Sequence, residues 1–95
     1  VKYQQQEHAA ALQAFNEALK LHPRYSLAYY NRGLVQRDSG QPAAAFSDFT
    51  RALQINPRCI EALVNRGALL EDRGEYAQAL ADFNQALKLD KRYYM

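Results

Sequence analysis

The residues of this chain that could take part in catalysis or bind a metal are few and far apart. Its two histidines, His8 and His22, and its single cysteine, Cys59, form no H-E-x-x-H or C-x-x-C motif. The four glycines do not form the phosphate-binding pattern G-x-x-x-x-G-K-[ST] either. We therefore expect no catalytic centre, no metal site and no cofactor.

Carboxylates gather near the end of one expected helix, at Glu71, Asp72 and Glu75. Two carboxylates can act as general acid and base when their environments separate their pKa values. A solvated, charged helix end is the simpler interpretation, so we expect these three side chains to be exposed and the chain to be non-enzymatic. The lone Cys59 excludes an internal disulfide, should be a small, partly buried apolar side chain, and favours a reducing, cytoplasmic setting.

Charge and hydropathy exclude several classes of partner. The chain has 95 residues, a net charge of +2 and 48% apolar residues, and its basic residues form no run. A net charge this small does not favour nucleic acid or an anionic membrane as a partner. No stretch of the sequence approaches the roughly 18 consecutive apolar residues of a membrane-spanning helix. Because the first residue is Val1 and not methionine, we expect the segment to belong to a longer chain.

Sliding the sequence along itself until Asn31 falls on Asn65 brings many identical residues into register. The tripeptide Asn31-Arg32-Gly33 then matches Asn65-Arg66-Gly67. The other matches are Gly40 with Gly74, Ala45 with Ala79, Asp48-Phe49 with Asp82-Phe83, Ala52-Leu53 with Ala86-Leu87, and Arg58 with Arg92. A fixed period of this kind is typical of repeat architectures. It divides the single domain 1–95 into a partial unit 1–25, two complete units 26–59 and 60–93, and the start of a further unit at 94–95.

Each complete unit predicts two helices, because apolar residues recur at spacings of three and four. Gly40 and Gly74 stand where a helix ends in the left-handed conformation. Pro42 suits the first turn of the next helix, and Pro23 and Pro57 end the second helices. The predicted helices are 27–39, 42–55, 61–73 and 76–89.

The two ends of the chain depart from this regular pattern. Gln6 replaces the glycine of the turn, and the segment 2–21 contains no glycine or proline, so we expect one continuous helix there. Lys91 replaces the proline after the last helix, which predicts that this helix runs on towards Tyr94.

The pattern resembles the tetratricopeptide repeat family over essentially the whole chain. The unit of that family is about 34 residues long, with a large residue, Gly, Ala, an aromatic residue, Ala and Pro at set offsets. This series is supplied by Tyr29, Gly33, Ala45, Phe49, Ala52 and Pro57, and then by Leu63, Gly67, Ala79, Phe83 and Ala86. The resemblance implies an all-α, right-handed α-solenoid of antiparallel helix pairs.

In this family the first helices of the units line a concave groove that binds a peptide. The resemblance implies that the groove is lined here by Leu27, Tyr30, Asn31, Leu34 and Arg37, and by Glu61, Val64, Asn65, Ala68 and Glu71. Asn31 and Asn65 would form a ladder of amides that pairs with a peptide backbone; alternatively, each amide bonds a neighbouring backbone within the stack. Of the tyrosines, Tyr25, Tyr29, Tyr76 and Tyr93 occupy packing offsets, and only Tyr30 is free for another role.

Chaperone-binding members of the family hold an acidic tail with a clamp of Lys, Arg and Asn. Glu61 stands where a clamp lysine would be needed, and Asn65 where the arginine would be, so the clamp is incomplete.

Two arginines and two aspartates recur with the repeat and predict structural ion pairs. Arg32 and Arg66 lie beside the glycines, and Asp48 and Asp82 follow them at one and the same spacing along the chain. Bridges within each hairpin, or between Asp48 and Arg66 of neighbouring units, would hold the stack in register.

The most favoured function is therefore a non-enzymatic scaffold that binds a protein or peptide in the groove. Two alternatives stay open. One is a regulatory or substrate-docking arm of a larger enzyme. The other is a self-assembly module, in which exposed apolar ends stack or swap helices to form a homo-oligomer, because solenoid repeats cannot bury their faces alone.

Overall fold

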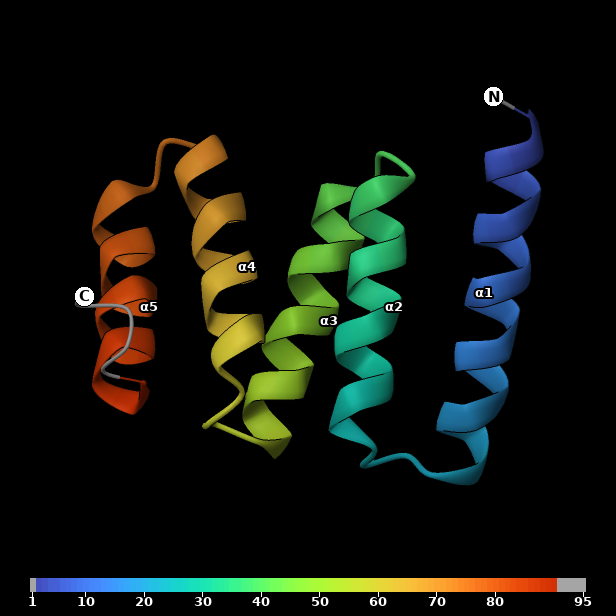
Figure 1. Ribbon diagram of the computed structural model, residues 1–95, viewed down its shortest axis with the longest axis horizontal. Coiled ribbons are helices and arrows are strands. Elements are labelled where there is room, and N and C mark those ends of the chain that lie inside the picture. Colours follow the sequence, from blue (N-terminus) through green and yellow to red (C-terminus); the bar gives the residue numbers. More distant parts are fainter. Residues whose placement is uncertain (1, 91–95) are drawn as a thin grey trace.

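The structure is a computed structural model that describes the backbone of residues 2–90 and the side chains of residues 6–90. Five helices and no strand make up this part of the chain: α1 (Lys2–Leu21), α2 (Ser26–Asp38), α3 (Pro42–Ile55), α4 (Ile60–Asp72) and α5 (Tyr76–Leu89). They follow one another in a row, each antiparallel to the next (Figure 1). The predicted all-α class and the four predicted helices are confirmed to within one residue.

Glycines end the first helix of each complete unit, as predicted. Gly40 has φ of +81° and Gly74 has φ of +80°, in the region that only glycine enters at little cost. The backbone N–H of Gln41 then donates to the carbonyl of Gln36 at 2.8 Å, and Glu75 donates to Leu70 at 2.9 Å. These bonds satisfy carbonyls at the helix end and turn the chain back on itself.

Of the two predictions made for the ends of the chain, the structure confirms one and contradicts the other. The first 20 helical residues form one uninterrupted helix, α1, which confirms the prediction for 2–21. The prediction that the last helix runs on towards Tyr94 is wrong at its first step, because α5 ends at Leu89 and Asp90 is extended (φ −136°, ψ 100°). Asn56 takes nearly the same conformation after α3 (φ −130°, ψ 89°), so this ending does not need the following proline. Tyr94 itself lies outside the described residues.

Close packing of each hairpin depends on a glycine opposite a phenylalanine. A Cβ atom at Gly33 would lie 2.7 Å from Cε1 of Phe49, and one at Gly67 would lie 2.7 Å from Cε1 of Phe83. Real side chains do not approach this closely, so the missing Cβ lets the two helices meet. Phe49 is 0% exposed and is the largest fully buried side chain of the described residues.

Tyr25 and Tyr76 do not pack as their offsets predicted. They are 47% and 67% exposed, and Pro42, which holds the place of Tyr76 in the preceding unit, is exposed as well. Tyr29 is half-buried beneath the guanidinium groups of Arg32 and Arg51, which lie 5.5 and 5.8 Å from its ring centre. Tyr93 lies outside the described residues.

Candidate functional site

Side-chain clusters that could hold a metal ion are not found where the structure describes the chain. Within residues 6–90, no group of three or more His, Cys, Asp or Glu side chains could hold a metal ion. None of the described helices is both long and apolar enough to cross a membrane. The carboxylates Glu71, Asp72 and Glu75 are exposed, as the solvated-end interpretation predicted. Cys59 is half-buried just before α4.

The recurring arginines and aspartates meet within each hairpin as bidentate pairs. Nε and Nη2 of Arg32 donate to the two carboxylate oxygens of Asp48 at 2.6 and 2.8 Å. Arg66 binds Asp82 in the same way, at 2.8 Å for both bonds. The aspartates are only 5% and 7% exposed. Hydrogen bonding to the carboxylate raises the pKa of each arginine above its ordinary value, although burial opposes this rise.

The link between neighbouring units runs through the third donor of each arginine and not through Asp48. Nη1 of Arg32 donates to Oδ1 of Asn16 on α1 at 2.8 Å. Nη1 of Arg66 donates to the hydroxyl of Thr50 on α3 at 3.4 Å. Each arginine therefore links its own helix to the helix before it and the helix after it. The sequence interpretation missed Asn16 and Thr50; their equivalent places in successive units and their shared polarity were the available signal.

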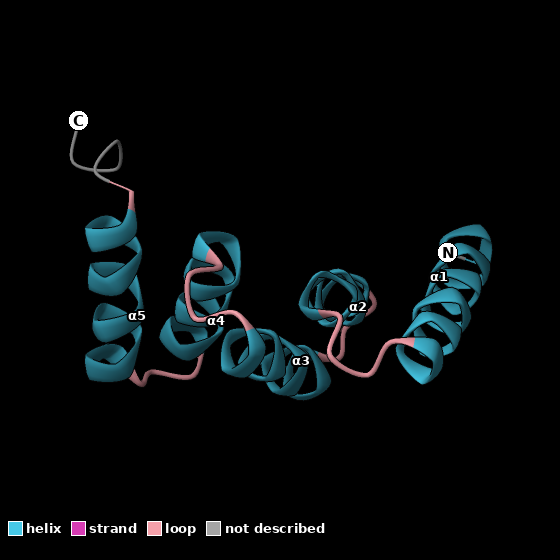
Figure 2. Ribbon diagram, turned by 90° about the horizontal axis from the view of Figure 1, so that it is seen from below, coloured by secondary structure: helices cyan, strands magenta, loops and turns pink. Residues whose placement is uncertain are grey.

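The residues assigned to the groove all lie on α2 and α4. In the row of helices, α2 and α4 lie on one side and α3 lies on the other (Figure 2). The ends of the two helices are open to solvent, with Leu27 50% exposed and Arg37 and Glu61 also exposed. The middle of this face is half-buried and consists of Tyr30, Asn31, Leu34, Val64, Asn65 and Ala68.

Asn65 connects the two helices of this face through a polar cluster. Its Nδ2 donates to the hydroxyl of Tyr30 at 3.1 Å and to the backbone carbonyl of Glu61 at 2.9 Å. Its Oδ1 accepts a hydrogen bond from Nη1 of Arg37. We call Tyr30, Arg37 and Asn65 the groove cluster. Both ends of the Asn65 amide are therefore used within the protein.

Asn31 occupies the same place in the preceding unit but differs in its contacts. Its side chain makes no hydrogen bond to any described residue, so its amide is open on the surface of α2. The predicted ladder of two equivalent amides thus becomes one engaged amide and one open amide. The alternative prediction, in which the amide bonds a neighbouring backbone, holds in part for Asn65, because its Nδ2 donates to the carbonyl of Glu61.

The sequence analysis predicted that Tyr30 is free for another role, but its ring packs against the core. Its ring lies 5.7 Å from that of Phe49, tilted by 41°, against the buried cluster of Ala45, Phe49 and Leu69. Burial raises the pKa of its hydroxyl above the ordinary value of 10.0, and the negative charge of Glu61 adds to this rise. Arg37 and the bond from Asn65 act in the opposite direction. The hydroxyl is thus neutral, and because its oxygen accepts from Asn65, its proton is available to another acceptor.

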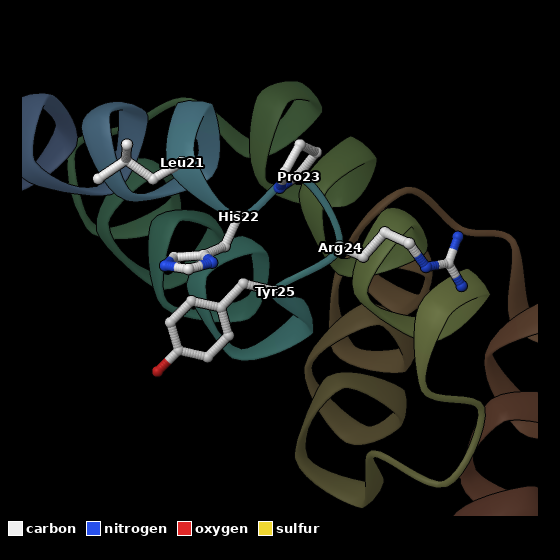
Figure 3. A pocket seen from close by; sticks show the side chains of 5 residues that line it. All are labelled: Leu21, His22, Pro23, Arg24 and Tyr25. Atoms are coloured by element: carbon white, nitrogen blue, oxygen red, sulfur yellow. The ribbon is translucent and has the colours of Figure 1, made fainter.

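An apolar hollow at the loop between α1 and α2 was not predicted from the sequence. It is lined by the consecutive residues 21–25. His22 and Tyr25 lie side by side, their ring centres 6.5 Å apart and their planes 89° apart, while Arg24 points away from them (Figure 3). Leu21 is 76% exposed beside this loop. The signal was the apolar character of Leu21 and Tyr25, whose counterparts Ile55 and Cys59 are half-buried.

Comparison with known proteins identifies the family of this helical array. Family models of the tetratricopeptide repeat match residues 1–58 and residues 60–93. The chain therefore belongs to the tetratricopeptide repeat family, whose modules are typically non-catalytic scaffolds for protein interactions. No curated protein sequence matches it.

Two solved structures, each described as a crystal structure of MamA, have the same fold. Their TM-scores are 0.85 and 0.79, both are 30% identical to this chain, and they cover 93% and 90% of it. The chain spans 52% and 47% of their lengths, which is about half of the solved chains it matches. The predicted solenoid of helix pairs is thereby confirmed.

Proposed function

We propose that the face formed by α2 and α4 binds a peptide segment of a partner protein, and that the chain acts as a non-enzymatic scaffold. The observation that carries this proposal is the pair of open polar groups in the middle of that face. These are the unbonded amide of Asn31 and the hydroxyl proton of Tyr30, whose oxygen is held by Asn65 at 3.1 Å. Both stand among apolar surface, which is how a binding groove combines affinity with orientation.

The chemistry of these groups favours the main chain of a peptide as ligand. An amide donates and accepts, and a hydroxyl whose oxygen is already used donates, so together they match a run of backbone C=O and N–H groups. The charges of the face include both Arg37 and Glu61, both exposed. An acidic tail would meet Glu61 where a clamp would need a lysine, so a strictly acidic ligand is disfavoured.

The test is recovery of binding partners by the chain as bait, with single substitutions in and outside the groove. We expect Asn31→Ala and Tyr30→Phe to reduce partner recovery, because each removes one open group. Asn84→Ala is the matched control, since Asn84 is an exposed asparagine on α5, outside this face. Equal recovery by wild type, Asn31→Ala and Tyr30→Phe would contradict the proposal.

Self-assembly is a second candidate function, and exposed apolar residues on α5 favour it. Tyr76 is 67% exposed and Leu80 is 59% exposed. If this face joins copies of the chain, the mass measured by light scattering should fall on dilution and Leu80→Glu should give a monomer. A mass that stays monomeric at high concentration rules it out. A docking arm of a larger enzyme would use the same groove and requires a catalytic domain in the same polypeptide.

A further inference from the structure

The carboxylate of Glu61 has no charged partner among the residues that the structure describes. Glu61 is exposed in the first turn of α4, and the ion pairs found within residues 6–90 use other carboxylates. Arg37, the cation of the groove cluster, is directed elsewhere. Its Nη1 donates to Asn65, and its Nε and Nη2 each lie 3.4 Å from Oδ1 of Asp38. A negative charge is therefore left open to solvent.

This carboxylate belongs to the side of α4 that faces α2. Glu61 precedes Asn65 by four residues, so the two side chains lie on one side of the helix. Asn65 in turn donates to the hydroxyl of Tyr30 on α2 at 3.1 Å. Burial and then the charge of Glu61 raise the pKa of this hydroxyl, which agrees with the position of Glu61. Both walls of the groove at this point, α2 and α4, belong to the described residues.

The charge of Glu61 is not needed to form the helix that carries it. A carboxylate in the first turn is favoured by the partial positive charge of a helix N-terminus, and this effect alone could explain an acidic residue there. In the preceding unit, however, Leu27 holds the place of Glu61, and α2 has no acidic residue in its first turn. Both helices are nevertheless 13 residues long. The carboxylate is thus available for a role in binding.

An apolar surface borders the carboxylate on the α2 side. The ring of Tyr30 and the side chain of Cys59 are both half-buried and pack against the buried Leu53 and Leu63. Cys59 is the N-cap of α4, so it lies close to Glu61 in the first turn. The side chains of lysine and arginine lay an aliphatic stem along apolar surface and keep a charged end in a polar place. An apolar patch beside an open carboxylate matches both parts of such a side chain.

We propose that Tyr30, Cys59 and Glu61 form a subsite of the groove that binds a lysine or arginine side chain of the partner peptide. The inference rests on the proposed function and specifies its ligand. The stem of the basic side chain lies on Tyr30 and Cys59, and its cationic end pairs with Glu61. Because Glu61 has no ion pair to give up among the described residues, this pairing favours a basic residue. An acidic residue at the same place would meet a like charge.

The test is selection from a phage-displayed library of short random peptides, with the full chain immobilised as bait. Wild type is compared with Glu61→Gln, Glu61→Lys and Glu17→Gln. Glu17→Gln is the matched control, because it removes the same charge from an exposed glutamate on α1, outside the groove. Circular dichroism verifies that every bait is helical before the selection.

We expect wild type and Glu17→Gln to select peptides that share a lysine or arginine at one position. Glu61→Gln should lose this preference, and Glu61→Lys should select aspartate or glutamate there. A selected peptide is then labelled, and its basic residue is changed to norleucine, which keeps the stem and removes the charge. Fluorescence anisotropy should show binding to wild type weakened about fivefold, near the upper limit for an exposed ion pair. Binding to Glu61→Gln should not change, because the charge has no partner there.

The outcomes separate this inference from the function on which it rests. If wild type selects peptides without a shared basic residue, or Glu61→Gln keeps the basic preference, the subsite is wrong while peptide binding stands. If no bait enriches any peptide over the bare support, the proposed function fails and the subsite fails with it. If light scattering shows that wild type self-associates and Glu61→Gln does not, a second copy of the chain occupies the subsite and the proposal of a partner peptide is contradicted.

Discussion

The hairpins α2–α3 and α4–α5 share one backbone plan, yet the same side chains meet different surroundings in them. Both have a glycine with φ near +80° at the turn, a glycine against a phenylalanine and a bidentate Arg–Asp pair. However, Phe49 is fully buried and Phe83 is half-buried, while Asn65 is fully engaged and Asn31 is open. Contacts within a hairpin are thus set by its own sequence, whereas contacts between hairpins depend on position in the stack.

The largest effect that distinguishes the two hairpins should come from removing their phenylalanines. Phe49→Ala deletes a side chain that is 0% exposed, which costs about 4 kcal/mol of unfolding free energy in a closed core. Phe83→Ala should cost about half as much, because Phe83 is half-buried and solvent can fill part of the space. Urea unfolding measures both. Equal losses of unfolding free energy would mean that the two phenylalanines contribute equally despite their different burial.

Adding a methyl group opposite each phenylalanine tests the same difference from the other side. The new Cβ of Gly33→Ala would clash with a ring that is fully enclosed, so we expect a net loss of about 1 to 2 kcal/mol even after the gain in helix propensity. The ring of Phe83 has an open side and can move away, so Gly67→Ala should be nearly neutral. Thermal or urea unfolding of the two variants measures both changes in unfolding free energy. If Gly33→Ala leaves the unfolding free energy unchanged, the ring of Phe49 can also move.

The two asparagines should differ in their contribution to stability. Asn65→Ala removes bonds to Tyr30, Arg37 and the carbonyl of Glu61, so we expect a loss of about 1 kcal/mol. Asn31→Ala removes no hydrogen bond to a described residue and should leave stability unchanged within error. If Asn31→Ala destabilises the chain as much as Asn65→Ala, the amide of Asn31 is not open in solution.

The smallest effect concerns the ionisation of Tyr30. Because burial and then Glu61 raise its pKa in the folded state, its neutral form contributes stability that is present below the unfolded pKa of about 10. That contribution is lost as the pH rises through the raised folded pKa. Alkaline titration of tyrosinate absorbance should show a late component that Tyr30→Phe removes and Glu61→Gln moves to lower pH. A late component that persists in Tyr30→Phe belongs to another tyrosine.

Glycines and prolines at the helix ends made most of the fold predictable. The four helices of the complete units lie within one residue of their predicted ranges. Gly40, Pro57 and Gly74 mark the ends of α2, α3 and α4 through backbone conformation alone. The same reasoning predicted that α1 is continuous. The further prediction that α5 runs on towards Tyr94 was wrong. The missing proline at Lys91 did not lengthen the helix, because Asp90 leaves the helical conformation as Asn56 does after α3.

The candidate site was only partly predictable. The spacing between Arg32 and Asp48 left two pairings open, and the structure has the one within the hairpin. Asn16 and Thr50 were missed because a polar residue on a helix has no feature that identifies its partner. Tyr30 was taken to be free, and Tyr25 and Tyr76 to be packed, because offsets within a unit do not report which neighbouring helix covers them.

The sequence by itself determined the repeat period, the helices and their turns, and which arginines and aspartates recur with the repeat, while the structure decided that they pair within each hairpin. These follow from backbone conformation and from residues that the chain brings together over short distances. Only the tertiary structure decided that Asn65 is bound while Asn31 is open, that Phe49 is sealed while Phe15 and Phe83 are not, and that a hollow opens beside Leu21. The reason is that the surroundings of a repeated residue depend on the helices packed on either side of its unit, and identical residues at different places in the stack do not have the same neighbours.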